Sequence, residues 1–176
     1  MKILLLLLLG ALGSPAQVDP LDGIWQGYYG EWRHVSNQLV ALAEAIPAGK
    51  YTWRPSLAVR SNSEVLMHIA ISNFALLSAT GPRMPADLTS DDMEKTVTAK
   101  PEVINWLKRS LDAVKMARTN LKPGDLPRKV KIEGRDATVD GMYLRIIVHA
   151  NEHMGQLVAY ARFNGIVPPW SDPARK

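Results

Sequence analysis

Apolar side chains recur at spacings of three and four residues along four separate stretches of this chain. Such spacing places them on one face of an α-helix and is typical of helices packed in a bundle. The four stretches cover about residues 22–46, 62–79, 101–121 and 140–164. We therefore predict an all-α fold, a four-helix bundle of the up-and-down type.

Local signals mark the start of one of these helices and the end of another. Ser61 and Glu64 have the capping-box pattern, in which Ser61 accepts from the backbone at the start of a helix and Glu64 reaches back to it. Gly165 is expected in the left-handed conformation that terminates the last helix. The second helix should therefore begin next to Ser61, and the last should end just before Gly165.

Two connections between the helices have patterns of their own. Residues 81–98 form a long polar connection between the second and third helices, with one helical turn expected near residues 91–95. Connections of this length in a compact domain are often functional or mobile. Residues 130–132 and 137–139 flank a polar turn and predict a small β-hairpin before the last helix.

The first residues have the pattern of a secretory signal peptide. Lys2 gives a positive start, residues 3–9 are an unbroken apolar run, and Ser14 and Ala16 occupy the −3 and −1 positions of a cut before Gln17. We predict a signal peptide over residues 1–16 and one mature domain over residues 17–176. The apolar run is shorter than the roughly 20 residues that span a bilayer. The mature protein is expected to be secreted or periplasmic, with no membrane segment.

Composition narrows the possible chemistry. The chain has no cysteine, so it has no disulfide, thiol nucleophile or thiolate metal ligand of its own. The formal net charge of +4 becomes +3 once Lys2 leaves with the signal peptide, and the cations are scattered along the chain. Nucleic-acid binding needs a clustered basic face, so no nucleic-acid partner is expected. Any metal must be held by histidine and carboxylate groups.

The last predicted helix is polar at its centre, where a bundle core is normally apolar. Its seam consists of Met142, Ile146, His149, His153, Gln156, Tyr160 and Phe163. Burying an unsatisfied imidazole or amide costs roughly 1–3 kcal/mol, so the polar positions need partners. His149 and His153 lie one turn apart, about 5–6 Å at Cβ, which allows two imidazoles to bind one cation. A metal site is favoured, and a hydrogen-bonded or solvated pair is the alternative.

The second predicted helix offers a third imidazole. His68 lies on a stripe of small residues, at a position where a core side chain is expected. If the second and fourth helices run in the same direction, His68 lies roughly 10 Å and His149 roughly 13 Å along them, at 1.5 Å per residue. The three imidazoles would then meet across the bundle core. Three protein ligands leave a coordination position open, which is typical of catalytic metal sites.

Glu152 raises a competing hypothesis. The stretch from His149 to His153 matches the His-x-x-Glu-His pattern of inverted zinc metallopeptidases, in which the glutamate is the general base. Those enzymes take a third ligand, a glutamate, far downstream, whereas Asp172 is the sole acid after His153. Glu152 also lies about 100° round the helix from His153. A position at the rim of the site is therefore expected for Glu152. Asn73 is a second candidate for the rim.

Three segments together resemble the DinB-like superfamily. They are residues 64–70 with one histidine, residues 149–157 with two histidines and a Gly-Gln-Leu ending, and residues 161–170 with Asn-Gly-Ile-Val-Pro-Pro-Trp. The likeness covers almost all of the mature chain. It implies a four-helix bundle, often dimeric, and a divalent metal, usually zinc or nickel, held by three histidines that correspond to His68, His149 and His153.

The resemblance also carries a hypothesis about function. Characterised relatives include thiol-cofactor-dependent S-transferases and a mycothiol-dependent isomerase, in which the metal activates a low-molecular-weight thiol. Our leading hypothesis is an exported metal-dependent enzyme of the thiol S-transferase or hydrolase type that acts on a small molecule. Gln156, as a hydrogen-bonding partner near the metal, and Glu152 are its candidate catalytic residues. The alternative is a non-catalytic binding or stress-associated protein whose histidine cluster is structural.

Overall fold

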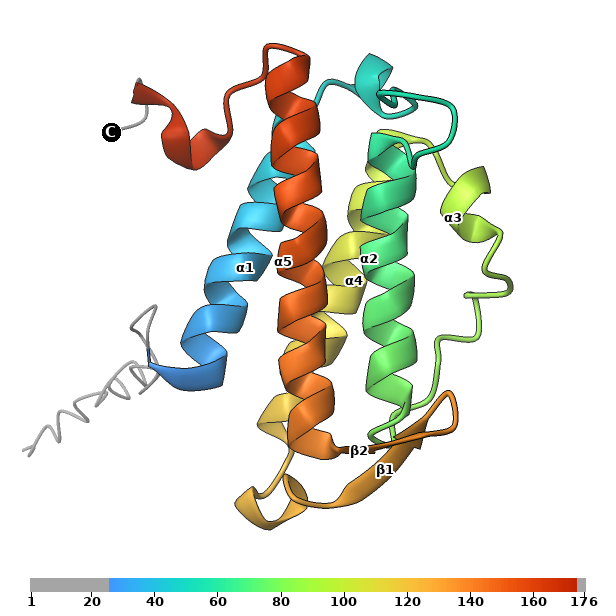
Figure 1. Ribbon diagram of the computed structural model, residues 1–176, viewed down its shortest axis with the longest axis vertical. Helices are drawn as coiled ribbons and strands as arrows, with labels where there is room; N and C mark the ends of the chain where they lie inside the picture. Colours follow the sequence, from blue (N-terminus) through green and yellow to red (C-terminus); the bar gives the residue numbers. More distant parts are fainter. Residues whose placement is uncertain (1–25, 174–176) are drawn as a thin grey trace, which may run out of the picture.

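The computed structural model of the protein describes residues 26–173, and four long helices form a bundle (Figure 1). These helices are α1 (Gly27–Ala45), α2 (Asn62–Ser78), α4 (Lys100–Thr119) and α5 (Val139–Phe163). The predicted four-helix bundle is confirmed. The predicted signal peptide, residues 1–16, lies outside the described residues. None of the described helices is long and apolar enough to cross a membrane.

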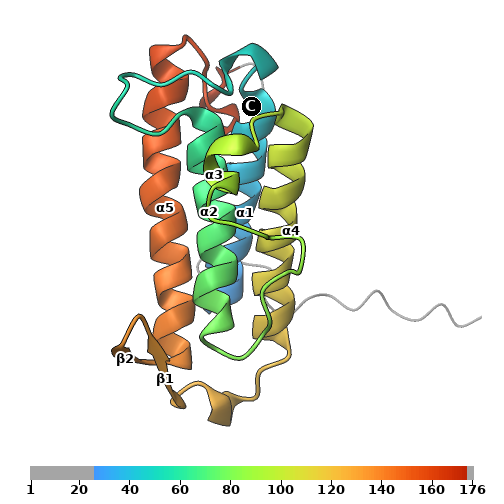
Figure 2. The same cartoon turned by 90° about the vertical axis from the view of Figure 1, so that its right-hand side faces the viewer.

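The directions of the helices differ from those expected. In Figure 1, α1 and α5 run up the bundle, whereas α2 and α4 run down it. The reason is the connection between α2 and α4, which returns along the length of the bundle before α4 begins (Figure 2). The expectation that the helices carrying His68 and His149 run in the same direction was therefore wrong, because α2 and α5 are antiparallel.

The predicted helix-end signals are present. The backbone nitrogen of Glu64 donates to Oγ of Ser61 at 3.3 Å, and the backbone nitrogen of Ser61 donates to Oε2 of Glu64 at 2.9 Å. These are the two hydrogen bonds of a capping box. Gly165 follows α5 with a φ of 71°, the left-handed conformation that glycine adopts without strain.

The connection between α2 and α4 contains the helical turn expected there. This turn is α3 (Met93–Thr96), and it packs against α2 (Figure 1). Val97 follows α3 and is buried in the core. The apolar anchor explains how an otherwise polar connection is held against the side of the bundle.

The predicted hairpin is also present, at the lower end of the bundle in Figure 1, with its first strand beginning one residue and its second strand two residues earlier than expected. Its strands are β1 (Lys129–Ile132) and β2 (Arg135–Thr138), which pair antiparallel with Val130 opposite Ala137. Val130 is buried and Ala137 is half-buried, so this face of the hairpin packs against the helices.

The core lies between the four long helices, and α2 is buried on several sides because it contacts α3, α4 and α5. Its fully buried large side chains include Leu39, Leu42, Leu66, Met67, Leu107, Ile146 and Leu157. Asn73 of α2 is also fully buried and donates from Nδ2 to Oγ of Ser110 on α4 at 3.1 Å. The prediction that Asn73 lies at the rim of the histidine site was therefore wrong.

Candidate metal centre

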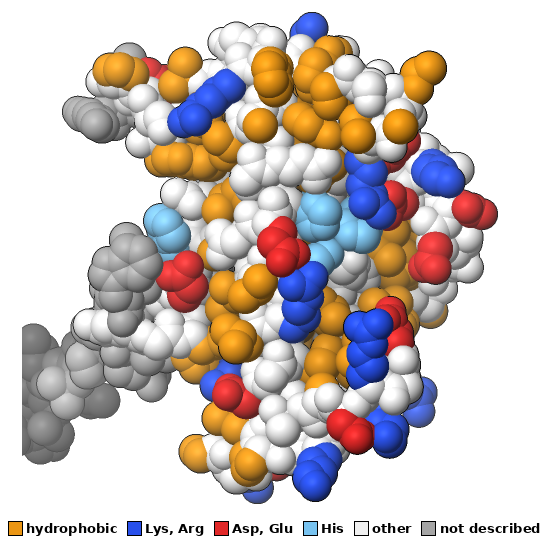
Figure 3. Space-filling view, in the orientation of Figure 1, with side chains coloured by type: hydrophobic (Ala, Val, Ile, Leu, Met, Phe, Trp, Pro, Cys, Tyr) orange, Lys and Arg blue, Asp and Glu red, His pale blue; other side chains and the backbone are white. Residues whose placement is uncertain are grey.

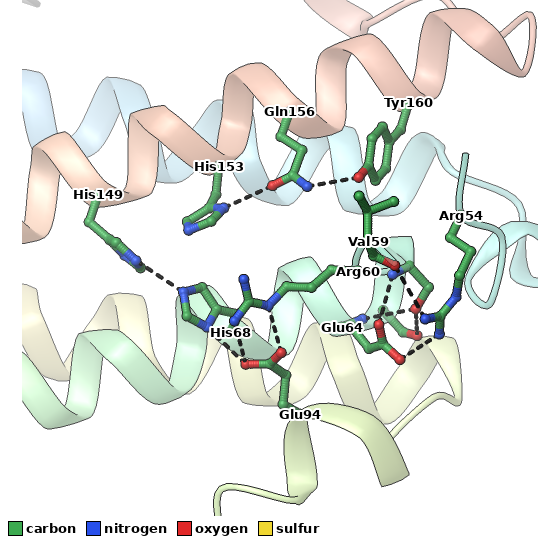
Figure 4. A network of polar contacts seen from close by, with 12 residues as sticks. Arg54, Val59, Arg60, Glu64, His68, Glu94, His149, His153, Gln156 and Tyr160 are labelled. Carbon is green, nitrogen blue, oxygen red and sulfur yellow. Dashed lines mark hydrogen bonds and ion pairs between the residues drawn. The ribbon is translucent and has the colours of Figure 1, made fainter. Parts of the chain in front are cut away.

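Three imidazole rings from two antiparallel helices converge on one point. His68 comes from α2, and His149 and His153 come from α5 (Figure 4). The ring centroids of His68 and His149 are 5.0 Å apart, those of His68 and His153 are 4.7 Å apart, and those of His149 and His153 are 4.6 Å apart. One nitrogen of each ring lies within 4.8 Å of the others. The structure thus brings together the three histidines that the sequence singled out.

The antiparallel arrangement explains why the rings meet. His68 lies ten residues before the end of α2 at Ser78, and His149 lies ten residues after the start of α5 at Val139. Both of these helix ends lie at the hairpin end of the bundle (Figure 1). At 1.5 Å per residue, each histidine is about 15 Å from that end. His153 lies one helical turn farther along α5 and completes a triangle.

The cluster lies at the surface where α2 meets α5, and not across the centre of the bundle as expected. Figure 3 shows histidine side chains open to solvent on this face, with acidic and basic side chains around them. The side chain of His68 is 22% exposed, whereas His149 is buried. A small molecule can therefore approach the imidazoles from solvent.

Glu94 of α3 orients the ring of His68. Its Oε2 lies 2.8 Å from Nδ1 of His68, and its Oε1 accepts a hydrogen bond of 2.6 Å from Nε of Arg60 (Figure 4). Burial alone would raise the pKa of the Glu94 carboxyl, but the hydrogen bonds from Arg60 and His68 outweigh it and hold the pKa below its usual value. The ionised carboxylate accepts the Nδ1 proton and leaves the lone pair of Nε2 directed at the cluster.

Gln156 orients His153 in the same way. Its Nε2 donates to the hydroxyl of Tyr160 at 2.8 Å, and its Oε1 lies 2.9 Å from Nδ1 of His153 (Figure 4). An amide oxygen only accepts hydrogen bonds, so Nδ1 carries the proton and the lone pair of His153 is on Nε2. Tyr160 in turn packs edge-on against Trp53, with ring centroids 5.6 Å apart. Gln156 thus acts through His153, the kind of role expected for it.

His149 has the least satisfied ring of the three. Its Nε2 lies 3.2 Å from Nε2 of His68, and its buried Nδ1 has no hydrogen-bond partner among the described residues. Burial and the neighbouring rings lower the pKa of His149 to about 4. Burial also lowers the pKa of His68, against the opposing effect of its hydrogen bond to Glu94. Both rings are therefore neutral at pH 7, the form of imidazole that binds metal ions.

This donor set fits a divalent transition-metal ion. In a tetrahedral site with metal–nitrogen bonds of about 2.0–2.1 Å, two ligand nitrogens lie about 3.3 Å apart. The Nε2 atoms of His68 and His149 are already 3.2 Å apart. No pair of ligand nitrogens exceeds 4.8 Å, so each remaining separation must shorten by no more than about 1.5 Å. Imidazole ligands suit zinc, nickel, copper and iron, and not the oxygen-preferring magnesium and calcium.

Glu152 is paired with Arg145 and makes no hydrogen bond to an imidazole among the described residues. Its two carboxylate oxygens each accept a hydrogen bond of 3.1 Å from the guanidinium of Arg145, and its side chain is 51% exposed. The ion pair lies at the rim of the site, in accord with the position of Glu152 round the helix. A carboxylate held this way is poorly placed to act as the general base of a metallopeptidase.

One groove includes a histidine of the cluster in its lining, and a second is lined by residues that contact the cluster. The larger groove, of about 1050 Å³, runs between α2, α5 and the hairpin and ends at His149. The smaller groove, of about 500 Å³, is lined by Arg60, Glu94 and Gln156 among others. A small molecule in the larger groove would thus contact His149.

The sequence did not reveal Glu94 and Arg60. The only signal was indirect, because Glu94 falls in the helical turn expected within a connection long enough to have a function. Arg60 directly precedes the N-cap residue Ser61, and an arginine at that position does not indicate a functional site. Their roles follow from contacts across 26 and 34 residues of sequence, from Glu94 to His68 and to Arg60.

Comparisons with known proteins agree with this architecture. Residues 31–157 match the family profile of the DinB superfamily, and this segment includes all three histidines. The crystal structure of a DinB-like protein from Bacillus cereus ATCC 10987 is similar, with a TM-score of 0.72 and 17% sequence identity over 82% of this chain and 95% of that chain. No curated protein matches the sequence. The family match spans well over half of the chain, and the chain therefore belongs to the DinB superfamily.

Proposed function

We propose that this protein is a metal-dependent enzyme in which His68, His149 and His153 hold one divalent ion, zinc or nickel. The observation that carries the proposal is the convergence of three imidazoles whose ligand nitrogens all lie within 4.8 Å of one another. Two of the rings are fixed by Glu94 and Gln156 with Nε2 turned toward the cluster. Three nitrogen ligands and an open position form the donor set of many catalytic zinc sites.

The bound ion would supply Lewis acidity, which lowers the pKa of a coordinated water or thiol. The protein's own contribution is positional. Glu94 and Gln156 hold the rings of His68 and His153, and the groove that includes His149 in its lining leaves space for a reactant. These features support either transfer of a low-molecular-weight thiol to an electrophile or hydrolysis of a small molecule.

The metal content of protein purified without an affinity tag tests the site directly. We expect about one equivalent of zinc or nickel per chain after loading. The single variants His68→Ala and His153→Ala should each lose most of it, because each removes one of three ligands. His34→Ala is a matched control, since His34 belongs to α1 and lies outside the cluster. Less than about a tenth of an equivalent in the loaded wild-type protein would refute the site.

Turnover separates the two reaction types. Metal-loaded protein should be assayed with glutathione, bacillithiol and mycothiol in the presence of an electrophilic acceptor. Thiol consumption that disappears in His153→Ala supports the transferase. Absence of turnover with all three thiols rejects the transferase and leaves the hydrolase, to be assayed on ester and amide substrates.

The second candidate function is a non-catalytic binding or stress-associated protein. The observation in its favour is that His68, His149 and Glu94 already form a connected polar network. Thermal melts distinguish the two candidates. If a metal is held, chelator lowers the melting temperature of the wild-type protein and leaves His68→Ala and His149→Ala nearly unchanged. Equal effects of chelator on all three proteins favour the structural network.

We further propose that the enzyme works outside the cytoplasm. The support is the charged start, the short apolar run and the small residues before Gln17. N-terminal sequencing of protein recovered from the periplasm or the medium should find Gln17 as the first residue. Recovery of the intact Met1 form from the cytoplasm alone would overturn export.

A further inference from the structure

The larger groove joins the histidine cluster to the hairpin, and we infer that it binds an elongated small molecule with a metal-binding donor at one end and an anionic group at the other. The inference rests on the proposed metal site, because the donor end would bind there. His149 marks one end of the groove, and Arg135 of β2 lies at the other. Arg135 would bind the anionic group.

The shape of the groove follows from small side chains on the two helices. Ser72 and Ala75 of α2 and Gly141 of α5 leave a hollow, and Leu76 and Met142 give it an apolar floor. From Gly141 to His149 is eight residues, or about 12 Å along α5. A volume of about 1050 Å³ is at the upper end of the range for small-molecule sites. The groove therefore suits a molecule much longer than a single metal-bound group.

The pleat of the hairpin determines which charge faces the groove. Arg135 pairs with Ile132 and shares a strand face with Val130 and Ala137, the face that packs against the helices. Arg135 is nevertheless exposed, and it makes no ion pair among the described residues that would occupy its guanidinium. A cation on the bundle-facing side of a strand, beside a groove, is well placed to bind an anion.

The turn of the hairpin keeps Arg135 at a fixed place. Glu133 and Gly134 have φ values of 50° and 75°, so both central residues have the positive φ of a type I′ turn. The backbone nitrogen of Val139 also donates to the carbonyl oxygen of Arg128 at 3.0 Å, which ties the two ends of the hairpin together. The distance from Arg135 to His149 is therefore set by the fold, and it selects for ligand length.

The remaining charges along the groove are largely balanced. Arg145 is held by both oxygens of Glu152, and Asp136 is paired with Lys131 at 2.7 Å. At the hairpin, Lys129 and Arg135 face a single further acid, Glu133. The hairpin end therefore keeps one excess positive charge, which complements an anionic group and not a cationic one.

Matched thiols test the inference on cobalt-loaded protein. The probes are mercaptooctanoic acid with mercaptooctanol, and mercaptopropionic acid with mercaptopropanol. Cobalt–thiolate absorption reports binding of the thiol at the metal, and calorimetry gives the affinity. We expect the long acid to bind about five- to tenfold more tightly than the long alcohol, and the short pair to differ by less than about twofold.

Two variants assign the preference to Arg135. Arg135→Gln should abolish the preference for the long acid and leave the affinity of the long alcohol unchanged. Lys115→Gln makes the same charge change on α4, at an exposed position outside the lining of the groove, and it should keep the preference. A preference that persists in Arg135→Gln, or that is equal for short and long pairs, would overturn the inference. Failure of every thiol to alter the absorption of bound cobalt would overturn the inference alone, whereas failure of cobalt itself to bind would refute the proposed metal site and the inference with it.

Discussion

Replacing Glu94 with glutamine should weaken metal binding while leaving the bundle intact. Glu94 contacts His68 at 2.8 Å and Arg60 at 2.6 Å, and it lies on the short helix α3 outside the four-helix core. A glutamine oxygen can still accept the Nδ1 proton of His68, so the tautomer is preserved. What is lost is the charge that strengthens this hydrogen bond and raises the basicity of Nε2.

The size of the effect follows from the contacts. A hydrogen bond to a charged group contributes about 1.5–3 kcal/mol, and a neutral one about half of that. The side chains of Glu94 and His68 are 19% and 22% exposed, so solvent screens the pair only in part. Replacing the carboxylate by an amide should therefore cost about 1 kcal/mol, or about a fivefold loss of zinc affinity. Glu94→Ala removes the acceptor altogether, and the loss should reach about 10–100-fold.

Competition with a chromophoric chelator at fixed pH measures these affinities, and circular dichroism checks the fold of each variant. Glu152→Gln is the matched control, because it removes a negative charge beside His153 without removing a contact to an imidazole. Its zinc affinity should stay within about twofold of the wild type. Equal losses in Glu94→Gln and Glu152→Gln would show that net charge, and not orientation of His68, sets the affinity. Unchanged affinity in Glu94→Ala would refute the reasoning.

Two further predictions concern stability. Ser61→Ala removes an acceptor of the capping box and should lower the free energy of unfolding in urea by about 1–2 kcal/mol, whereas a loss below about 0.3 kcal/mol would contradict the role of the cap. In metal-free protein, the pKa of His149 is about 4, below the value of about 6.5 in the unfolded chain, so the unfolded state binds more protons between these values. Stability should therefore rise from pH 4 to pH 6.5, and His149→Asn should flatten that rise. Urea titrations in chelator measure it, and an equal pH dependence in wild type and variant would contradict the assignment.

The helices and one of the site contacts could be predicted because they depend on local sequence. Spacing of apolar residues, the Ser61 cap and the Gly165 terminator act within a turn or two of helix. Gln156 lies three residues after His153, and residues three apart share a helix face, so its hydrogen bond to that ring is also a local property. Each of these features was therefore visible in the sequence alone.

Glu94 could not be identified in this way. Its contact with His68 spans 26 residues and depends on the path of the connection between α2 and α4. The chain has 17 acidic residues, and an acid in an irregular connection has no periodicity that would distinguish it from the others. The prediction for Asn73 failed for a different reason. It assumed that the Asn73 side chain faces the histidine site, but α2 is buried on several sides, and Asn73 faces α4. Helix periodicity does not say which neighbour a buried face meets.

The convergence of the three histidines was anticipated although the assumed helix directions were wrong, and the position of His68 explains why. His68 lies six residues from the start of α2 and ten from its end. Reversing the helix within the bundle moves it by only four residues, or about 6 Å, which is close to one turn. A ligand near the middle of a helix is thus nearly insensitive to helix direction, and matching depths could not have distinguished the two topologies. A ligand at the end of α2 would have moved by most of the helix length. Depth arguments from sequence therefore discriminate between bundle topologies only when a ligand lies near a helix terminus.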